Sequence, residues 1–231
     1  MISLHDKKAC EALRAGLDEG GYGIIPGLLA RGECEGLAAG YVSDQFRSTV
    51  VMARHGFGSG EYKYYSYPLP SLVAEVRAAL YQRLVPIAND WQEALGSPIR
   101  YPLTLAEFLE RCHSAGQKRP TPLILRYGPG DYNCLHQDVY GDTLFPLQVA
   151  VLLSDTAKFS GGEFVLTEQR PRRQSRARIV PLQQGEAIIF PVRDRPVRGT
   201  RGFYRVQHRH GVSDIRSGER HTLGLIFHDA V

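Results

Sequence analysis

The fold is decided by eight short, mostly apolar stretches that follow Pro122: ILRY (124–127), LHQDVY (135–140), LQVAVLL (147–153), GEFVLT (162–167), RIVPL (178–182), AIIFPV (187–192), YRVQHRHGV (204–212) and HTLGLIF (221–227). Turn-forming residues separate them, and this spacing is typical of an all-β sandwich or barrel. A jelly roll, which arranges such strands in two facing sheets, fits the pattern. We therefore expect a jelly-roll core over residues 121–231.

The first half of the chain is predicted to be mainly helical. Residues 4–18 are helix-prone. Between residues 71 and 95, apolar residues recur at steps of three and four, which indicates a helix that Pro86 is expected to kink or divide. Thr104 and Glu107 form a T-x-x-E capping box for another helix. We expect residues 1–120 to form a helical extension packed on the core, giving a mainly β protein buttressed by helices.

Composition narrows the class of protein. The chain has 231 residues, of which 43% are hydrophobic and 23% charged, as in an ordinary globular domain. No apolar run is long enough to span a membrane, and the polar start MISLHDKKACEAL lacks the apolar segment of a secretory signal. The four cysteines are far apart in sequence, which favours reduced thiols and a cytoplasmic location. The sequence carries no signal for an oligomeric state.

Basic residues are unevenly distributed. The net charge is +4, with five arginines in residues 170–178 and six in residues 193–209. Two arginine-rich loops of this kind are candidates for contact with nucleic acid. The alternative is a solvated rim of loops that binds nothing.

The sharpest local feature is His136-Gln137-Asp138. If these residues lie on a strand, His136 and Asp138 point to the same face and can grip one ion. Imidazole and carboxylate suit a divalent transition metal, and two histidines with one carboxylate leave coordination positions open. Because an isolated HxD is common by chance, this motif needs a third ligand before it predicts a metal site.

Candidates for that third ligand lie near the C-terminus. His208 and His210 share a strand face in the expected strand. Ten residues after His210, Arg220 and Thr222 again stand at i and i+2, where a guanidinium and a hydroxyl can bind the carboxylate of a small diacid. This spacing favours His210 over His208. Both histidines could instead be ordinary core or surface residues.

Together these stretches resemble a known superfamily. RYGPGDYNCLHQD (126–138), SGGEF (160–164), QQGEAIIF (183–190) and HGVSDIRSGERHT (210–222) occur in the order found in iron(II)/2-oxoglutarate oxygenases. The resemblance implies a double-stranded β-helix with iron(II) on His136, Asp138 and His210. It also implies that 2-oxoglutarate binds Arg220, helped by Thr222 and Tyr127, and that dioxygen is the oxidant.

Two branches of the superfamily compete. RYxPG followed by LHQD looks like the AlkB-type nucleic-acid demethylases, whereas GGEF, GEAIIF and the step from His210 to Arg220 look like prolyl-4-hydroxylases. Leu125 and Ile226 stand where AlkB-type enzymes carry an asparagine and a second arginine. The chain as a whole resembles a bacterial oxygenase family whose usual label is oxidative demethylation of damaged DNA.

These features lead to one expected function and its alternatives. The chain is expected to be a dioxygenase (an oxidoreductase) that hydroxylates a C–H bond, with demethylation of alkylated nucleic acid, and hence DNA repair, as one possible role. A prolyl-hydroxylase-like protein hydroxylase and a small-molecule hydroxylase are alternatives. A jelly-roll module that binds a metal or a small acid without catalysis is the non-enzymatic alternative.

Residues 50–70 are the candidate substrate lid. Arg54 precedes Tyr62, Tyr64 and Tyr65, and aromatic residues interleaved with cations can clamp a base. The same residues could grip a peptide or form a hairpin that covers the sheet. Glycines between them are expected to make the segment mobile. Cys134 is expected to share the strand face of His136, as a pocket residue or a small buried hydrophobe.

Overall fold

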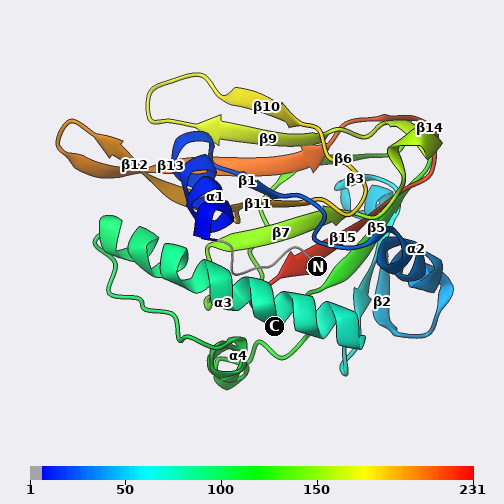
Figure 1. The fold of residues 1–231 in the computed structure, drawn as a ribbon, viewed down its shortest axis with the longest axis horizontal. Helices are drawn as coiled ribbons and strands as arrows, with labels where there is room; N and C mark the ends of the chain where they lie inside the picture. Colours follow the sequence, from blue (N-terminus) through cyan, green and yellow to red (C-terminus); the bar gives the residue numbers. More distant parts are fainter. Residues whose placement is uncertain (1–6) are drawn as a thin grey trace.

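Two facing antiparallel sheets form the body of the protein, as a computed structural model that describes residues 7–231 shows (Figure 1). The seven-stranded major sheet has the order β1 (Gly23–Ile25), β11 (Ala187–Pro191), β7 (Leu147–Leu152), β15 (Arg220–Ile226), β5 (Leu123–Tyr127), β4 (Glu61–Tyr65) and β2 (Phe46–Val51). The minor sheet has the order β10 (Arg176–Val180), β9 (Phe164–Gln169), β13 (Gly202–Val212), β6 (Tyr132–His136) and β3 (Gly58–Ser59), with β12 (Asp194–Gly199) also paired to β13. Strands β8 (Phe159–Gly161) and β14 (Ile215–Gly218) pair separately. This is the expected double-stranded β-helix.

Four α-helices buttress the sheets: α1 (Lys7–Gly20), α2 (Arg31–Ala39), α3 (Ser71–Ala94) and α4 (Leu105–Ser114). Short 3-10 turns are η1 (Gly40–Val42), η2 (Met52–His55) and η3 (Thr156–Lys158). The expected capping box opens α4, since Thr104 accepts from the backbone of Glu107. Pro86 lies inside α3 without dividing it. The start of the expected first helix, residues 4–6, lies outside the described residues.

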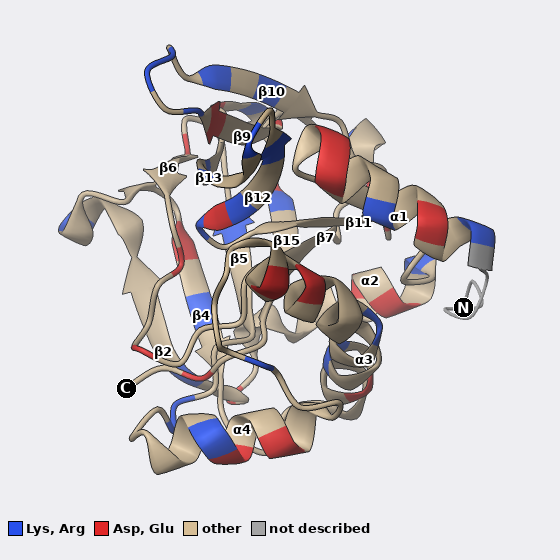
Figure 2. Ribbon diagram, turned by 90° about the vertical axis from the view of Figure 1, so that its left-hand side faces the viewer, with Lys and Arg blue, Asp and Glu red and all other residues tan. Residues whose placement is uncertain are grey.

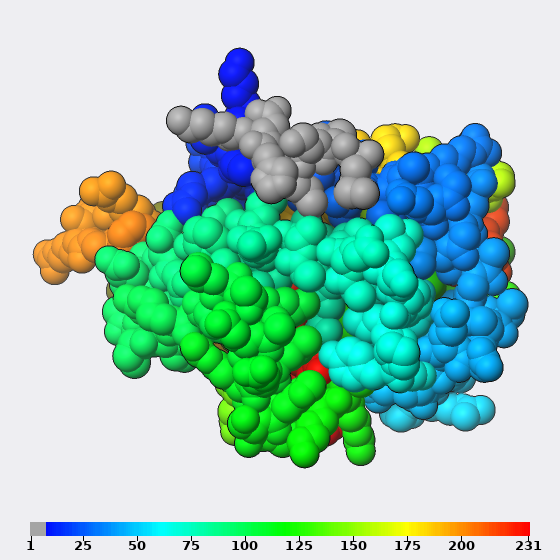
Figure 3. All heavy atoms as spheres, turned by 60° about the horizontal axis from the view of Figure 1, so that its bottom comes forward, coloured from blue at the N-terminus to red at the C-terminus, as the bar shows by residue number. Residues whose placement is uncertain are grey.

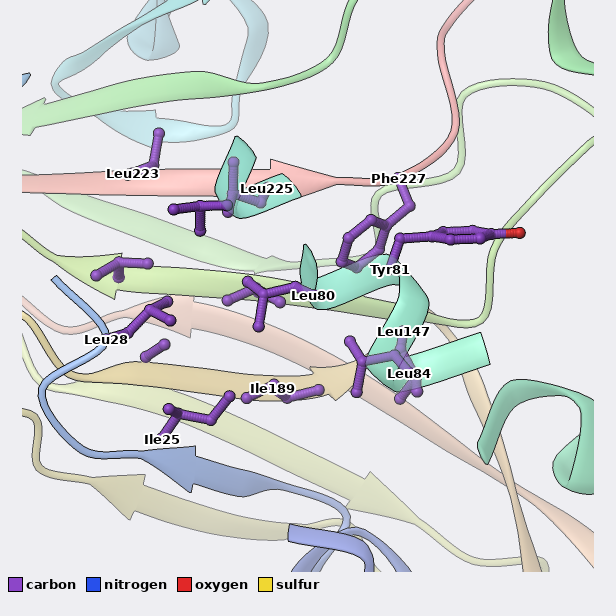
Figure 4. Close-up of a cluster of buried hydrophobic side chains, with 14 of the residues drawn as sticks. Ile25, Leu28, Leu80, Tyr81, Leu84, Leu147, Ile189, Leu223, Leu225 and Phe227 are labelled. Atoms are coloured by element: carbon purple, nitrogen blue, oxygen red, sulfur yellow. The ribbon is translucent and has the colours of Figure 1, made fainter. Parts of the chain in front are cut away.

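The main core lies between α3 and the outer face of the major sheet (Figure 4). Leu80 and Leu84 of α3 belong to the same buried cluster as Leu147 of β7 and Leu225 of β15. The alternate residues of these strands face the minor sheet, where Ala150 of β7 joins a second cluster. Because the major sheet is covered on both faces, β7 is buried along its whole length, which explains its continuous apolar sequence.

The first 120 residues contribute strands as well as helices. β1 pairs with β11 and β4 pairs with β5, so both join the major sheet next to strands of the C-terminal half. β3 pairs with β6 at the edge of the minor sheet. Apart from the hairpin considered as an alternative for residues 50–70, the sequence patterns gave no sign of these strands, which have two to six residues and are too short for a clear period. The helical half is therefore interleaved with the core.

No helix within residues 7–231 is both long enough and apolar enough to cross a membrane.

Candidate metal centre

A β-bulge places the first candidate ligand. In the pairing of β6 with β13, His136 lies opposite His210 and Asn133 lies opposite Val212. β6 therefore has two residues between these pairs where β13 has one, and such a bulge changes the alternation of side chains. Asn133 and His136 both line the cavity between the sheets, whereas Cys134 is exposed. The expectation that Cys134 shares the face of His136 is wrong, because simple alternation does not hold across the bulge.

Two contacts support this geometry. A Cβ at Gly211 of β13 would lie 2.6 Å from the carbonyl oxygen of Asn133, so the bulge can approach β13 only because residue 211 has no side chain. Nδ1 of His136 lies 2.8 Å from the carbonyl oxygen of Cys134. When Nδ1 donates its proton to this carbonyl, Nε2 is left free to face the cavity as a metal ligand.

Asp138 lies beyond the strand that was expected to carry it. β6 ends at His136, so the two residues meet through the bend of the chain rather than through strand alternation. Nε2 of His136 lies 3.5 Å from Oδ1 of Asp138, and Nε2 of His210 lies 3.4 Å from Oδ2. The three ligand atoms all lie within 4.8 Å of one another. This arrangement can hold a divalent metal ion with coordination positions left open.

The protonation states of Asp138 and His210 suit a cation. Burial alone raises the pKa of Asp138, but hydrogen bonds from His136 and His210 outweigh it and hold that pKa well below its usual value. Burial and the neighbouring His136 lower the pKa of His210. A charged carboxylate and a neutral imidazole are the forms that bind metal. Burial opposes protonation of His136, but the hydrogen bond with Asp138 raises its pKa overall.

His208 has a different role from His210 on the same strand. Its Nε2 accepts a hydrogen bond of 3.0 Å from Nε of Arg195. Arg195 is itself buried and paired with Glu168, with Nη2 to Oε2 at 2.6 Å. His208 thus belongs to a buried polar network beneath α1, where Arg195 also donates to the carbonyl oxygen of Asp18. It is His210 that the structure brings to His136 and Asp138.

Arg220 lies at the other end of the same cavity. Its side chain is buried, and Nη1 donates to the hydroxyl of Thr222 at 2.6 Å. Tyr127, opposite it on β5, is fully buried, and its ring centroid lies 5.8 Å from the guanidinium carbon. Nε of Arg220 has no hydrogen-bond partner, and none of the described carboxylates forms an ion pair with it. A buried cation in this state requires an anion to offset its desolvation.

The cavity that joins these two groups has a volume of about 190 Å³. Apart from the residues named above, its walls are mostly apolar or aromatic, and include Phe164, Phe190, Leu123, Leu125, Val149 and Ile226. The rings of Phe190 and His210 are 4.7 Å apart. An apolar chamber with a metal centre at one end and a cation at the other fits a small dianionic co-substrate between them.

Tyr140 is a functional residue that the sequence analysis missed. It lines the cavity, and its hydroxyl donates to Oδ1 of Asp138 at 2.6 Å. The hydroxyl of Tyr64 donates in turn to Tyr140 at 3.2 Å, and the guanidinium of Arg47 lies 4.5 Å from the centre of the Tyr64 ring. In the sequence, the only sign of a role for Tyr140 was its position two residues after Asp138. Asn133 and Gln148 were also missed, because each becomes a cavity residue only through pairing between strands.

The candidate lid residues separate into three environments. Tyr62 lines the cavity, and Tyr64 reaches it through Tyr140. Tyr65 points to the opposite face of β4, where its ring lies 4.6 Å from that of Phe46 in the main core. It therefore cannot contact a substrate in the cavity. Arg54 is exposed in η2 and is not part of the cavity wall.

The segment around the lid is fixed by pairing rather than loose. β2, β3 and β4 tie residues 46–65 to both sheets. A Cβ at Gly58, which has φ +128°, would lie 2.4 Å from the carbonyl oxygen of Tyr132. The glycine here serves a close approach of two backbones. Phe57 is 47% exposed and also lines the cavity, so the cavity opens beside β3.

Two solved structures of oxygenases resemble this fold. The chain resembles a 2-oxoglutarate/iron(II) oxygenase family oxidoreductase from Burkholderia pseudomallei, with a TM-score of 0.57 at 16% identity over 96% of this chain and 92% of that one. It also resembles a prolyl-4-hydroxylase from Pseudomonas putida, with a TM-score of 0.55 at 15% identity over 93% and 96% of the two chains. At these identities the likeness establishes the fold.

Sequence comparisons are more specific. Uncharacterised proteins from two strains of Mycobacterium tuberculosis are 51% identical over 164 residues, which is 71% of this chain and 70% of theirs. A family model described as "Oxygenase, catalysing oxidative methylation of damaged DNA" matches residues 60–230. That match covers the candidate metal centre, the arginine end of the cavity and most of both sheets. The chain belongs to this oxygenase family.

Proposed function

We propose that this protein is an iron(II)- and 2-oxoglutarate-dependent dioxygenase that hydroxylates a C–H bond. His136, Asp138 and His210 would hold the iron, and Arg220, Thr222 and Tyr127 would bind 2-oxoglutarate. The observation that carries the proposal is the buried guanidinium of Arg220, which has no acidic partner among the described residues and faces the cavity of the three candidate ligands. A diacid bound to the metal would fill open coordination positions at one end of the cavity and would place a carboxylate beside Arg220 at the other.

The residues present fit these groups. Two imidazoles and one carboxylate are a ligand set that non-haem iron(II) accepts, with positions left for a chelating co-substrate and for dioxygen. A guanidinium with a neighbouring hydroxyl binds a carboxylate through several charge-assisted hydrogen bonds. With 2-oxoglutarate and dioxygen, iron(II) supplies oxidation of a substrate C–H bond coupled to release of succinate and carbon dioxide.

The protein's own residues bind, orient and exclude water. The hydrogen bond from His136 to the Cys134 carbonyl fixes which nitrogen faces the metal. Arg220, held by Thr222, would fix the distal carboxylate. Phe164 and Phe190 wall the cavity beside His210 and keep bulk water from it.

We further propose alkylated nucleic acid as the substrate, with oxidation of an N-methyl carbon and its loss as formaldehyde. Membership of a family described as acting on damaged DNA supports this choice, as do the arginines of residues 170–178 and 193–209 as phosphate contacts. Four free cysteines, two of them buried, support a cytoplasmic location.

The test is product release by anaerobically purified protein given iron(II), 2-oxoglutarate and air. Succinate and formaldehyde are measured with and without an N-methylated single-stranded oligonucleotide. We expect the oligonucleotide to stimulate both products, and His136→Ala to abolish the response with the fold retained. His113→Gln, which changes a histidine on α4 outside the cavity lining and keeps a hydrogen-bond donor for Asp229, is the matched control and should respond as the wild type does.

Other results would redirect the proposal. Slow succinate release that the oligonucleotide does not change would leave the oxygenase in place and turn the search to peptides and small metabolites. Full activity of His136→Ala would contradict the metal site. Failure to bind iron(II) or to consume 2-oxoglutarate would favour a binding module without catalysis.

A further inference from the structure

Positive charge is concentrated in two segments of the chain. Residues 170–178 and 193–209 together hold eleven arginines, no lysine and one acidic residue, Asp194, which gives them a net charge of +10. Because the whole chain carries +4, the remaining residues carry a net charge of −6. Such segregation creates a local positive field that a uniform surface of the same net charge would not have.

The structure brings both segments to one end of the minor sheet. Residues 193–209, of which 204–209 were expected on a strand and the rest in a loop, form most of the β12–β13 hairpin. Residues 170–178 form the turn between β9 and β10 and the start of β10. Gln207 of β13 pairs with Gln169 of β9, so the two hairpins are neighbours. Basic residues gather over the β9–β10 hairpin and beside β12 (Figure 2). The turn of the β12–β13 hairpin projects beyond the rest of the molecule (Figure 3).

Only part of this charge is neutralised locally. Glu168 pairs with Arg170 and Arg195, and Asp194 pairs with Arg193 and Arg205. Within the described part of the chain, six further arginines are exposed and form no ion pair with an acidic side chain: Arg172, Arg173, Arg176, Arg198, Arg201 and Arg209. The Arg205–Asp194 pair, at 3.7 Å and with Arg205 exposed, is weak and can be exchanged for a phosphate.

Strand β13 presents two different rows of side chains. The row that faces the other sheet includes Val206, His208 and His210, all buried, and ends at the metal centre. The opposite row consists of Phe203, Arg205, Gln207 and Arg209, all exposed. Phe203 is 51% exposed although it is a large aromatic residue. The outward row thus alternates an aromatic ring, a cation, an amide and a second cation.

We propose that this outward row of β13, together with the arginines of the two hairpin turns, binds single-stranded nucleic acid and leads it to the cavity. Arginine suits phosphate because its guanidinium donates bidentately, and an exposed ring beside it can stack an unpaired base. The exposed Phe203 favours a single strand over a duplex, whose bases are already stacked. This inference rests on the proposed function, whose substrate it specifies.

The reach of the surface sets a length for the ligand. Phe203 and Arg209 are six residues apart on β13, a distance of about 20 Å, and crossing β6 to the edge strand β3 adds about 10 Å. Phe57, beside β3, marks the opening of the cavity. At about 3.4 Å per stacked nucleotide, the path of about 30 Å needs about nine nucleotides. A trinucleotide can occupy the cavity alone, whereas a dodecanucleotide can occupy both.

The first experiment measures binding of a fluorescent single-stranded dodecanucleotide across a series of salt concentrations. The test variant combines Arg201→Ser, Arg205→Ser and Arg209→Ser. The control combines Arg14→Ser, Arg31→Ser and Arg100→Ser, which are exposed arginines elsewhere with the same change in net charge. We expect the test variant to bind at least tenfold more weakly in 0.15 M salt. The slope of the logarithm of its binding constant against the logarithm of salt concentration should be smaller in magnitude by about 2, since each phosphate contact to a single strand contributes about 0.7. The control should keep the wild-type slope.

The second experiment asks what kind of partner is bound. Phe203→Ala should weaken binding of the dodecanucleotide about tenfold and leave binding of a dodecamer duplex unchanged. Equal losses in the test and control variants, or equal binding of a poly-glutamate peptide of similar charge, would overturn the proposal, because either result means only a general attraction to polyanions.

Turnover separates this inference from the proposed function. In the test variant, succinate formation without oligonucleotide and with a methylated trinucleotide should match the wild type, while stimulation by the methylated dodecanucleotide should fall at least tenfold. Unchanged stimulation by the dodecanucleotide would overturn the surface and leave the dioxygenase intact. Absence of succinate from the wild-type protein would instead refute the proposed function, while the binding data would still decide whether the surface exists.

Discussion

The carboxylate of Asp138 is held by more than its two histidine neighbours. Its Oδ1 accepts the hydroxyl of Tyr140 at 2.6 Å, while Oδ2 faces His210. A hydrogen bond to one carboxylate oxygen fixes the rotation of the group and leaves the other oxygen for a metal. Tyr140 is therefore a positioning residue for the proposed iron site.

Removing that hydroxyl should weaken metal binding without unfolding the protein. We expect Tyr140→Phe to lower the affinity for cobalt(II), a stand-in for iron(II), by roughly 10- to 100-fold, the range found for outer-shell partners of metal ligands. Calorimetric titration of the metal-free protein measures this directly. Tyr132→Phe on β6, where the side chain is exposed, is the control. Equal affinities for the two variants would remove Tyr140 from the site.

Substitution of Arg220 should affect the stability of the ligand-free protein and its stabilisation by 2-oxoglutarate in different ways. Because its buried cation has no acidic partner, Arg220→Met should be at least as stable as the wild type when no ligand is present. At 100 times its dissociation constant, 2-oxoglutarate with metal should stabilise the wild type by about 2.7 kcal/mol and should not stabilise the variant. Thermal unfolding with and without 2-oxoglutarate measures both effects, and an equal ligand response would place the co-substrate carboxylate elsewhere.

For single residues, the sequence identified the candidate metal and co-substrate ligands better than the residues that surround them. His136, Asp138, His210 and Arg220 could be chosen because their spacing is local and chemically specific. Tyr140 and Asn133 could not, since their roles depend on a bulge and on pairing with strands distant in sequence. Tyr65 was placed on the wrong side of its strand because it follows Tyr64 directly, and neighbouring residues of a strand face opposite ways.

Helix α3 is joined to the end of the chain by a buried ion pair. Nη2 of Arg77 lies 3.0 Å from Oδ1 of Asp229, and both side chains are almost completely buried. Oδ2 of Asp229 also accepts from Tyr67 at 2.8 Å and lies 2.9 Å from Nε2 of His113 on α4. One carboxylate thus connects two helices with the segment that follows β15.

Breaking this pair should cost far more than breaking an exposed one. Asp229→Ala leaves Arg77 buried and uncompensated, so we expect a loss of about 3–5 kcal/mol in the free energy of unfolding. Asp90→Ala, which removes the exposed pair of Arg14 and Asp90, should cost less than about 1 kcal/mol. Urea denaturation compares the two. A small loss in Asp229→Ala would mean that water or neighbouring groups solvate Arg77 after all.

Helices long enough to show a periodic pattern or a capping motif were predicted well, and short strands were not. The stripe from residue 71 to 95 identified α3, and the capping box identified the start of α4. Pro86 did not divide α3 as expected, because packing against the major sheet maintains the helix beyond it. Strand β1 was missed, and a hairpin in residues 50–70 was only one of several alternatives, because pairing with distant strands stabilises β1, β3 and β4 and their own sequences do not.

For the molecule as a whole, two buried neutral histidines predict sensitivity to acid. Burial, aided by Arg195, lowers the pKa of His208 to about 4, and burial lowers that of His228 to about 4. In the unfolded chain each titrates near pH 6.5. The unfolded state therefore binds more protons between these values, so stability is complete above pH 6.5 and falls as the pH drops toward 4.

Each histidine should contribute a slope of up to about 1.4 kcal/mol per pH unit in that range. Urea denaturation between pH 7 and 5 measures the slope before most carboxylates begin to protonate. The double variant His208→Gln and His228→Gln should unfold with a flatter dependence on pH over this range. A slope that the double variant leaves unchanged would mean that other groups account for the acid sensitivity.

The bulge in β6 has a consequence for how the family can change over evolutionary time. One additional residue between Asn133 and His136 lets both side chains face the cavity although they are three positions apart. Loss of one of residues 134–135 would remove the bulge and restore simple alternation, with Asn133 and His136 still on the cavity side. A homologue with a one-residue gap at residues 134–135 should therefore keep this wall of the cavity and no longer need glycine at the position of Gly211, whereas a gap of two residues would turn Asn133 away from the cavity.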